Sequence, residues 1–234
     1  MKKSKLARLL AAVCCFAMLL TACSSPAPSG SESTPPSSSE PETEEKVLTF
    51  AIGAETTTLS TLYMNNSLCC TSMLVYENLV DFDNGEIVPG LAESWEYNDD
   101  QTELTFHLRQ GVTFHNGEPF NAEAVKTNLE HKQSNPSFYT LKGITDITEM
   151  EIVDDYTITL HYDHPFYAYL QDFCWPDVNP MSAPEFIIPG DFQTISGVAG
   201  TGPYIYDEYV AGEYTRFVRN ENYWRKALLG RDHR

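Results

Sequence analysis

The chain has 234 residues and a formal net charge of −18, from 15 basic and 33 acidic residues. So large an acidic excess argues against nucleic-acid binding, because phosphate contacts require lysine and arginine. The charge does not identify a ligand, since it bears on solubility more than on fold.

The N-terminus has the pattern of a secretory signal peptide. Basic residues precede the apolar run LLAAVCCFAMLL at 9–20, which ends in LTAC. A membrane-spanning helix needs about 20 apolar residues, so this run has the length of a signal peptide instead. The small residues Thr21 and Ala22 before Cys23 resemble the bacterial lipobox, which implies cleavage before Cys23 and acylation of its thiol. We therefore expect 1–22 to be a lipoprotein signal peptide and Cys23 to be the lipidation site; the alternative is an ordinary signal peptide with an incidental cysteine.

The next segment has the composition of a tether. Residues 24–45 contain only Ser, Pro, Glu, Thr, Ala and Gly, so nothing there can be buried and chain entropy keeps the segment disordered. Proline and like-charged glutamate extend such a segment. We predict that 23–45 is a lipid-anchored linker that holds an extracytoplasmic protein at the cell membrane.

Three cysteines remain after the signal peptide and the lipidated residue: Cys69, Cys70 and Cys174. Adjacent cysteines rarely pair with each other, so Cys174 is able to bridge to either one in an oxidising compartment. The alternative is three buried thiols, and both interpretations stay open. No C-x-x-C spacing occurs, so neither a zinc site nor a redox motif is expected.

The folded part is expected to begin near residue 46. The alternating sequence KVLTFAIG at 46–53 predicts a strand. Apolar residues at near-helical spacing predict a helix over 70–83, which runs into a DNGE turn. A short helix is predicted for LAESW at 91–95, with Trp95 packed against the hairpin that follows.

Further along, the chain shows hairpin and helix patterns. TELTFHLRQGVTFHNG at 102–117 predicts a hairpin around Gln-Gly. A helix is predicted from Asn121, its N-cap, with Val125 and Leu129 on one face. Two more hairpins are predicted, over 149–163 around Asp-Asp and over 201–220 around Ala-Gly. Strands mixed with helices, without regular βαβ alternation, indicate an α/β or α+β domain.

Two long stretches carry a recognisable pattern. The first contains YENL, then PGLAESW, then TFHLRQGVTFHNGEPFNAEAV; the second runs GTGPYIY…RNENYW. They resemble the family 5 extracellular solute-binding proteins, the peptide- and nickel-binding receptors of ABC importers. The resemblance covers nearly all of 46–224. It implies an α/β, periplasmic-binding-protein-like fold (type 2), in which two lobes close over a cleft and the first lobe carries an extra subdomain.

The resemblance also implies domain boundaries. Residues 46 to about 65 would start the first lobe, about 66–197 would form the extra subdomain, and the chain would return to the first lobe at 198. The second lobe of such receptors lies beyond Trp224, and the basic tail 225–234 matches nothing in the pattern. We therefore interpret 46–224 as the N-terminal part of the family domain, in a chain shortened by truncation or a frameshift.

Within the family, SFYTLKGITDI and YLQDFCWPDVNPMSAPEF resemble the nickel-binding branch. That implies an aromatic residue and an arginine that hold a metal chelate. The aromatic falls at Phe138 or Tyr139, but the arginine position holds Asp177, which cannot make the bidentate contact of arginine with a carboxylate. An anionic chelate is thereby disfavoured and a cationic group, such as a peptide amine, becomes an alternative. Trp175 would supply an apolar wall, unless it belongs to the core.

These observations predict the substrate-binding lipoprotein of an ABC importer. It would take up a small peptide or metal chelate outside the cytoplasmic membrane and deliver it to the permease subunits, without catalysis, cofactor or structural metal. No H-E-x-x-H or G-x-S-x-G motif occurs, and we attribute the histidines to solvent-facing strands. The alternatives are a tethered surface lipoprotein that binds another protein and a histidine-containing metal-dependent hydrolase.

Overall fold

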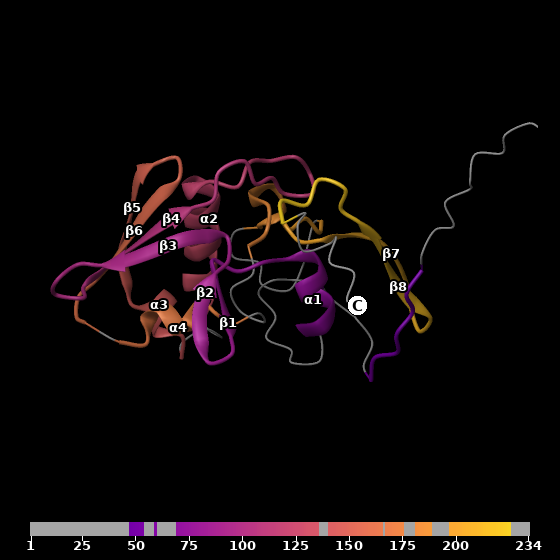
Figure 1. Ribbon diagram of the computed structural model, residues 1–234, viewed down its shortest axis with the longest axis horizontal. Coiled ribbons are helices and arrows are strands. Elements are labelled where there is room, and N and C mark those ends of the chain that lie inside the picture. Colours follow the sequence, from indigo (N-terminus) through magenta and orange to yellow (C-terminus); the bar gives the residue numbers. More distant parts are fainter. Residues whose placement is uncertain are drawn as a thin grey trace, which may run out of the picture. The chain divides into compact units, whose positions relative to one another are not determined.

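A computed structural model describes residues 47–53, 59, 69–135, 140–165, 167–175, 181–188 and 197–225. The chain divides into two units, 1–49 and 50–234, and every helix and strand below lies in the second (Figure 1). In chain order these elements are α1 (Cys69–Val75), β1 (Val80–Asp83), β2 (Glu86–Pro89), β3 (Ala92–Tyr97), β4 (Glu103–Leu108), α2 (Ala122–Gln133), α3 (Lys142–Thr145), β5 (Ile147–Asp154), β6 (Thr157–Tyr162), α4 (Tyr169–Asp172), the 3-10 helix η2 (Pro184–Phe186), β7 (Tyr204–Val210) and β8 (Tyr214–Arg219).

The largest sheet has four antiparallel strands in the order β3-β4-β6-β5. Alternate residues of its two central strands are fully buried, Leu104 and Phe106 on β4 and Ile158 and Leu160 on β6. They share one hydrophobic core with the apolar face of α2. The opposite face of β4 carries polar side chains, as expected for an antiparallel sheet with one solvated side.

The helix predicted from Asn121 is confirmed. Asn121 has extended backbone angles, and its side-chain oxygen accepts a hydrogen bond of 2.9 Å from the Ala124 N–H, as an N-cap does. Val125 and Leu129 are completely buried one turn apart. The cap and the apolar stripe are both local signals, so this helix could be predicted from the sequence before the residues that pack against it were known.

The hairpins predicted over 149–163 and 201–220 are also confirmed, as β5–β6 and β7–β8. Gly212 lies in the β7–β8 turn at φ +73°, a conformation that favours glycine.

The hairpin predicted over 102–117 is wrong. Its first half is β4, but β4 pairs with β3 and β6 and not with the residues that follow it. Val112 and Phe114 are buried, and the Phe114 ring packs edge-on against Phe120 at 5.9 Å. A bridge between Thr113 and Pro119 closes this turn. The alternation of apolar residues at 112 and 114 therefore reflects burial in a turn and does not indicate a strand.

The short helix predicted for 91–95 is a strand, β3. Trp95 stands opposite Phe106 of β4, so the packing of Trp95 against the following strand is right although the secondary structure is not. Pairing with β4 supplies hydrogen bonds that five residues of helix could not supply for themselves.

The helix predicted over 70–83 ends at Val75. Residues 80–83 form β1, which turns into β2 through Asn84 and Gly85, at φ +50° and +92°. Two consecutive residues with positive φ are typical of the tightest hairpin turns. The chain therefore forms the β1–β2 hairpin where we predicted that the helix would continue.

The strand predicted over 46–53 is not present in the described residues 47–53. Phe50 and Ile52 are exposed, at 52% and 39% of their surface. A strand requires a partner to satisfy its backbone groups, and no described strand pairs with this segment.

A second, smaller hydrophobic cluster lies apart from the main core. Leu59, Val75 and Tyr76 form it, with Tyr206 and Phe217 of the β7–β8 hairpin packed against them. Figure 1 shows α1 beside this hairpin and away from the four-stranded sheet. The domain boundaries expected at about 66 and 197 stay predictions.

Candidate functional site

Four residues were predicted to contact the ligand, and the structure describes one of them. Phe138, Tyr139 and Asp177 lie outside the described residues. Trp175 is 53% exposed and therefore does not belong to the core. Its side chain is available for contact with another molecule.

Cys174, directly before Trp175, and Met181 are each hydrogen-bonded to one of two consecutive residues. The Asn78 side-chain amide donates to the Cys174 carbonyl at 3.4 Å, and the Met181 N–H donates to the Glu77 carbonyl at 2.9 Å. Glu77 and Asn78 thus hold the described residues on either side of 176–180.

Cys174 itself is a buried free thiol, which excludes in this structure the disulfide that the sequence left open. Its Sγ donates to the Leu170 carbonyl at 3.8 Å. Burial, with a smaller contribution from the nearby carboxylates of Asp81 and Asp172, raises the pKa of the Cys174 thiol to about 11. A thiol in this environment is unreactive, because the thiolate is the nucleophile.

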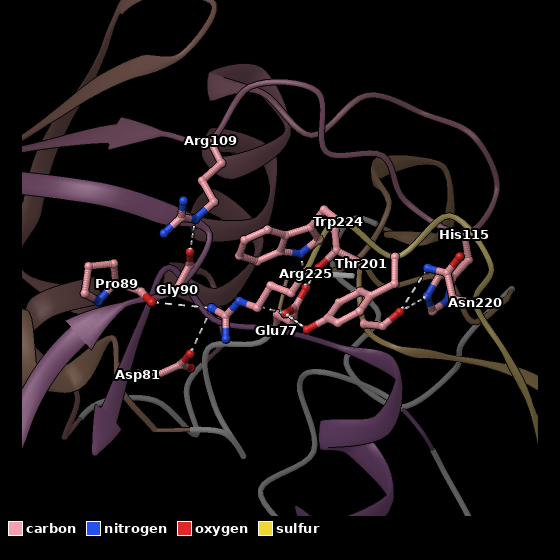
Figure 2. Close-up of polar contacts among 12 residues, drawn as sticks. Glu77, Asp81, Pro89, Gly90, Arg109, His115, Thr201, Asn220, Trp224 and Arg225 are labelled. Carbon is pink, nitrogen blue, oxygen red and sulfur yellow. Dashed lines mark hydrogen bonds and ion pairs between the residues drawn. The ribbon is translucent and has the colours of Figure 1, made fainter. Parts of the chain in front are cut away.

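Glu77 links the N-terminal part of the described fold to four residues near its C-terminal end (Figure 2). Its Oε2 accepts hydrogen bonds from Thr201 Oγ1 at 2.8 Å and from Trp224 Nε1 at 2.7 Å, and its Oε1 accepts one from the Tyr223 hydroxyl at 2.8 Å. Arg225 Nε lies 3.9 Å from Oε1. We refer to these five residues as the Glu77 cluster.

Burial and hydrogen bonding act in opposite directions on Glu77. Only 11% of its side chain is exposed, and this burial raises the pKa of the carboxyl. The hydrogen bonds from Trp224, Tyr223 and Thr201 and the positive charge of Arg225 lower that pKa in part. Both oxygens already accept hydrogen bonds within the protein, so we interpret the Glu77 cluster as a structural junction.

Arg225, which we assigned to a basic tail unlike the rest of the domain, is part of this junction. Its guanidinium lies 4.4 Å from the centre of the Trp224 ring and 3.3 Å from Asp81 Oδ2, and 23% of its side chain is exposed. Arg109 contacts the same ring at 4.9 Å and donates from Nε to the Gly90 carbonyl at 2.8 Å. The sequence offered one signal, the position of Arg225 directly after a motif rich in aromatic residues.

A smaller junction lies next to it, at the Gly202 carbonyl. His115 Nε2 and Asn220 Nδ2 each lie 3.0 Å from this oxygen. Gly202 is required here, because a Cβ would lie 2.7 Å from the Leu74 carbonyl oxygen. Burial lowers the pKa of His115, and the contact with the Gly202 carbonyl opposes that shift.

The histidines do not share one environment. His107 and His161 lie on strands of the four-stranded sheet near carboxylates, His107 at 3.7 Å from Glu96 and His161 at 3.3 Å from Glu151, as predicted for solvent-facing strands. His115 and His131 depart from that prediction, since His115 lies in the turn after β4 and His131 is buried on α2.

Two further findings concern only the residues that the structure describes. They contain no group of three or more His, Cys, Asp or Glu side chains placed to hold a metal ion. No helix among them combines the length and apolar character needed to cross a membrane.

The sequence matches the family described as bacterial extracellular solute-binding proteins, family 5 (middle), over residues 86–231. The chain belongs to this family. The nickel-binding periplasmic protein of Escherichia coli is 36% identical over 171 residues, which cover 70% of this chain and 32% of that protein. Glutathione-binding protein GsiB of Pectobacterium atrosepticum is 33% identical over 191 residues, which cover 76% of this chain and 35% of that protein.

Among solved structures, the chain is similar to NikA from Brucella suis in complex with Fe(III)-EDTA, with a TM-score of 0.65 and 36% identity. That comparison covers 71% of this chain and 34% of NikA. The fold is therefore that of a type 2 periplasmic binding protein, of which this chain contains an N-terminal portion. The chain spans about a third of the length of these relatives, and the family match extends past Trp224 to residue 231.

Proposed function

We propose that this chain is part of a substrate-binding lipoprotein of an ABC importer, which captures peptides or nickel-like metal chelates outside the cytoplasmic membrane and delivers them to the permease. The family match over 86–231 is the observation that carries this proposal. Relatives named for binding nickel and glutathione support a small solute as the ligand. A receptor of this kind binds and releases its ligand without chemical change.

The ligand contacts proposed on this side are Phe138 or Tyr139, Trp175 and Asp177. The exposed indole of Trp175 supports a role as an apolar wall. Asp177 brings a negative charge, which would attract a peptide amine or a cationic chelate and repel a carboxylate-rich one. We therefore expect Asp177 to set the preferred charge of the ligand.

A chimeric receptor tests this assignment. Residues 46–225 would replace the matching N-terminal part of the Escherichia coli nickel-binding protein, and the chimera would be titrated calorimetrically with nickel–histidine and with small peptides. We expect binding of one ligand class, recovery of the ligand at unchanged mass, and a shift toward anionic chelates in Asp177→Arg. A folded chimera that binds neither class, or that converts its ligand, would contradict the proposal. The unmodified Escherichia coli nickel-binding protein is the positive control.

The membrane anchor is a separate part of the proposal. We infer that peptidase removes 1–22, that Cys23 carries lipid and that 23–45 is the tether; several acyl chains would hold the protein firmly at the membrane. Mass spectrometry of the membrane fraction should find acyl groups on Cys23, and Cys23→Ala should move the protein to the soluble fraction. Soluble wild-type protein with an unmodified Cys23 would refute the anchor.

By itself, the 234-residue chain is expected to bind these ligands only weakly. Small-molecule sites commonly bury about 70–90% of the ligand surface, and the chain spans about a third of its relatives. An open face provides neither the desolvation nor the shape complementarity of a closed cleft. A ligand-induced rise in melting temperature comparable to that of the Escherichia coli nickel-binding protein would show that this expectation is wrong.

A further inference from the structure

Arg109 differs from the other arginines that the structure describes. Arg216, Arg219 and Arg225 each have an aspartate or glutamate oxygen within 4 Å, whereas Arg109 pairs with none among the described residues. This is unexpected in a chain with 33 acidic residues. No carboxylate among the described residues is thus in ion-pair contact with Arg109.

The Arg109 guanidinium is nevertheless held in place. Its Nε donates to the Gly90 carbonyl at 2.8 Å, and its Cζ lies 4.9 Å from the centre of the Trp224 ring. Both supports are themselves fixed. Gly90 is packed so closely that a Cβ would lie 2.6 Å from the Asn78 carbonyl oxygen, and the Trp224 indole donates to Glu77.

A second arginine lies beside the same tryptophan. Arg225 contacts the same indole, and Figure 2 shows the two guanidiniums near Trp224. The charge of Arg225 is matched by Asp81 at 3.3 Å and Glu77 at 3.9 Å. Both carboxylates therefore lie within 4 Å of Arg225, and neither is in ion-pair contact with Arg109, whose two terminal nitrogens form no ion pair with the described residues.

We propose that Arg109 is a carboxylate-binding site, in which its two terminal nitrogens form an end-on fork for the two oxygens of one carboxylate. Arginine suits planar, bidentate recognition of this group. Because the Gly90 carbonyl and the Trp224 ring already hold the side chain, little further rotamer entropy is lost when the anion binds. The carboxylate comes either from a small anion in solution or from an acidic side chain of a second copy of this chain. The site uses none of the residues proposed to contact the transported ligand.

The indole N–H resonances provide a direct test. The sequence has three tryptophans, so the Trp224 signal can be assigned by elimination with Trp95→Phe and Trp175→Phe. Acetate and succinate are titrated into the 15N-labelled chain at constant ionic strength. We expect a saturable shift of the Trp224 signal, and an apparent Kd about tenfold higher in Arg109→Gln, because a charge-assisted hydrogen-bonded pair is lost.

Two variants separate the fork from general charge. Arg109→Lys keeps the charge without the fork and should bind more weakly than wild type, while Arg216→Gln removes an exposed, paired arginine and should bind as wild type does. The proposal is overturned if Arg216→Gln weakens binding as much as Arg109→Gln, or if the wild-type Trp224 signal responds neither to added carboxylate nor to protein concentration. The wild-type titration decides the matter even if a variant fails to fold.

A dilution series distinguishes the two sources of the carboxylate. If a second copy supplies it, the Trp224 signal shifts with protein concentration in the absence of added anion, and sedimentation shows a dimer that Arg109→Gln abolishes. If a small anion supplies it, the shift requires added acetate or succinate. Absence of both responses would refute the site altogether.

Discussion

Replacement of Glu77 by glutamine tests whether the Glu77 cluster holds the two ends of the fold together. Glu77 accepts from Thr201 and Trp224 on one oxygen and from Tyr223 on the other, at 2.7–2.8 Å. Glutamine keeps one oxygen acceptor and places an NH2 group where the second carboxylate oxygen accepted a hydrogen bond. It also removes the negative charge that faces Arg225.

The expected loss is about 2–3 kcal/mol of unfolding free energy, because a hydrogen bond to a charged group contributes about 1.5–3 kcal/mol and the remaining donor is left buried without an acceptor. Tyr223→Phe, which removes a single donor, should cost about 1–2 kcal/mol. The double variant should lose less than the sum, since the glutamine NH2 then faces no hydroxyl.

Urea unfolding at pH 7, followed by tryptophan fluorescence, measures these differences at an unchanged m-value. Glu149→Gln on β5 is the matched control, because Glu149 is exposed and surface substitutions usually stay within about 0.5 kcal/mol of wild type. If Glu77→Gln is as stable as Glu149→Gln, the hydrogen bonds of the Glu77 cluster do not stabilise the fold and the reasoning is refuted.

Three further predictions concern stability. Burial lowers the pKa of Lys132 to about 7 from 10.5, so the unfolded chain binds this proton more tightly and stability should rise between those pH values, by up to about 1.4 kcal/mol per pH unit. Urea unfolding of Lys132→Met should lack that rise with pH, and the variant should exceed wild type in unfolding free energy most at pH 7. The surface control Lys126→Met should keep the rise. Equal pH slopes in wild type and Lys132→Met would contradict this. Asn121→Ala should lower the unfolding free energy by about 1 kcal/mol through loss of the N-cap, and Asn121→Ser should restore most of it. Limited proteolysis should leave a resistant fragment from about 66–197, and early cleavage inside that range would argue against these boundaries.

The parts of the fold that could be predicted from sequence are those determined by neighbouring residues. The cap at Asn121 and the β5–β6 and β7–β8 hairpins depend on positions a few residues apart. The choice of the strand that pairs with β4 does not depend on neighbouring positions. Phe106 stands opposite Ile158, more than fifty residues away, and local alternation cannot say which strand will satisfy it.

The candidate site was less predictable for the same reason. Glu77 was treated as one residue of a family motif, while its hydrogen-bond donors lie 124 to 147 positions away. A signal was nevertheless present, because a carboxylate among Val75, Tyr76, Leu79 and Val80 requires buried partners. Nothing in the sequence identified which residues would supply them.

The Glu77 cluster has a consequence for the order in which the chain folds. A chain that emerges from its N-terminus first presents Glu77 long before Tyr223 and Trp224, so its carboxylate must stay hydrated until the last described residues arrive. Contacts at such sequence separation form late, because the loop-closure entropy is lost before the contact can compensate for it. The Met181 amide bonds to the Glu77 backbone across 104 residues, a shorter loop than the 146 and 147 of Tyr223 and Trp224, and it does not depend on those late residues. In pulsed hydrogen exchange we therefore expect Met181 to become protected before the Trp224 indole, and simultaneous protection would show that both form in one step.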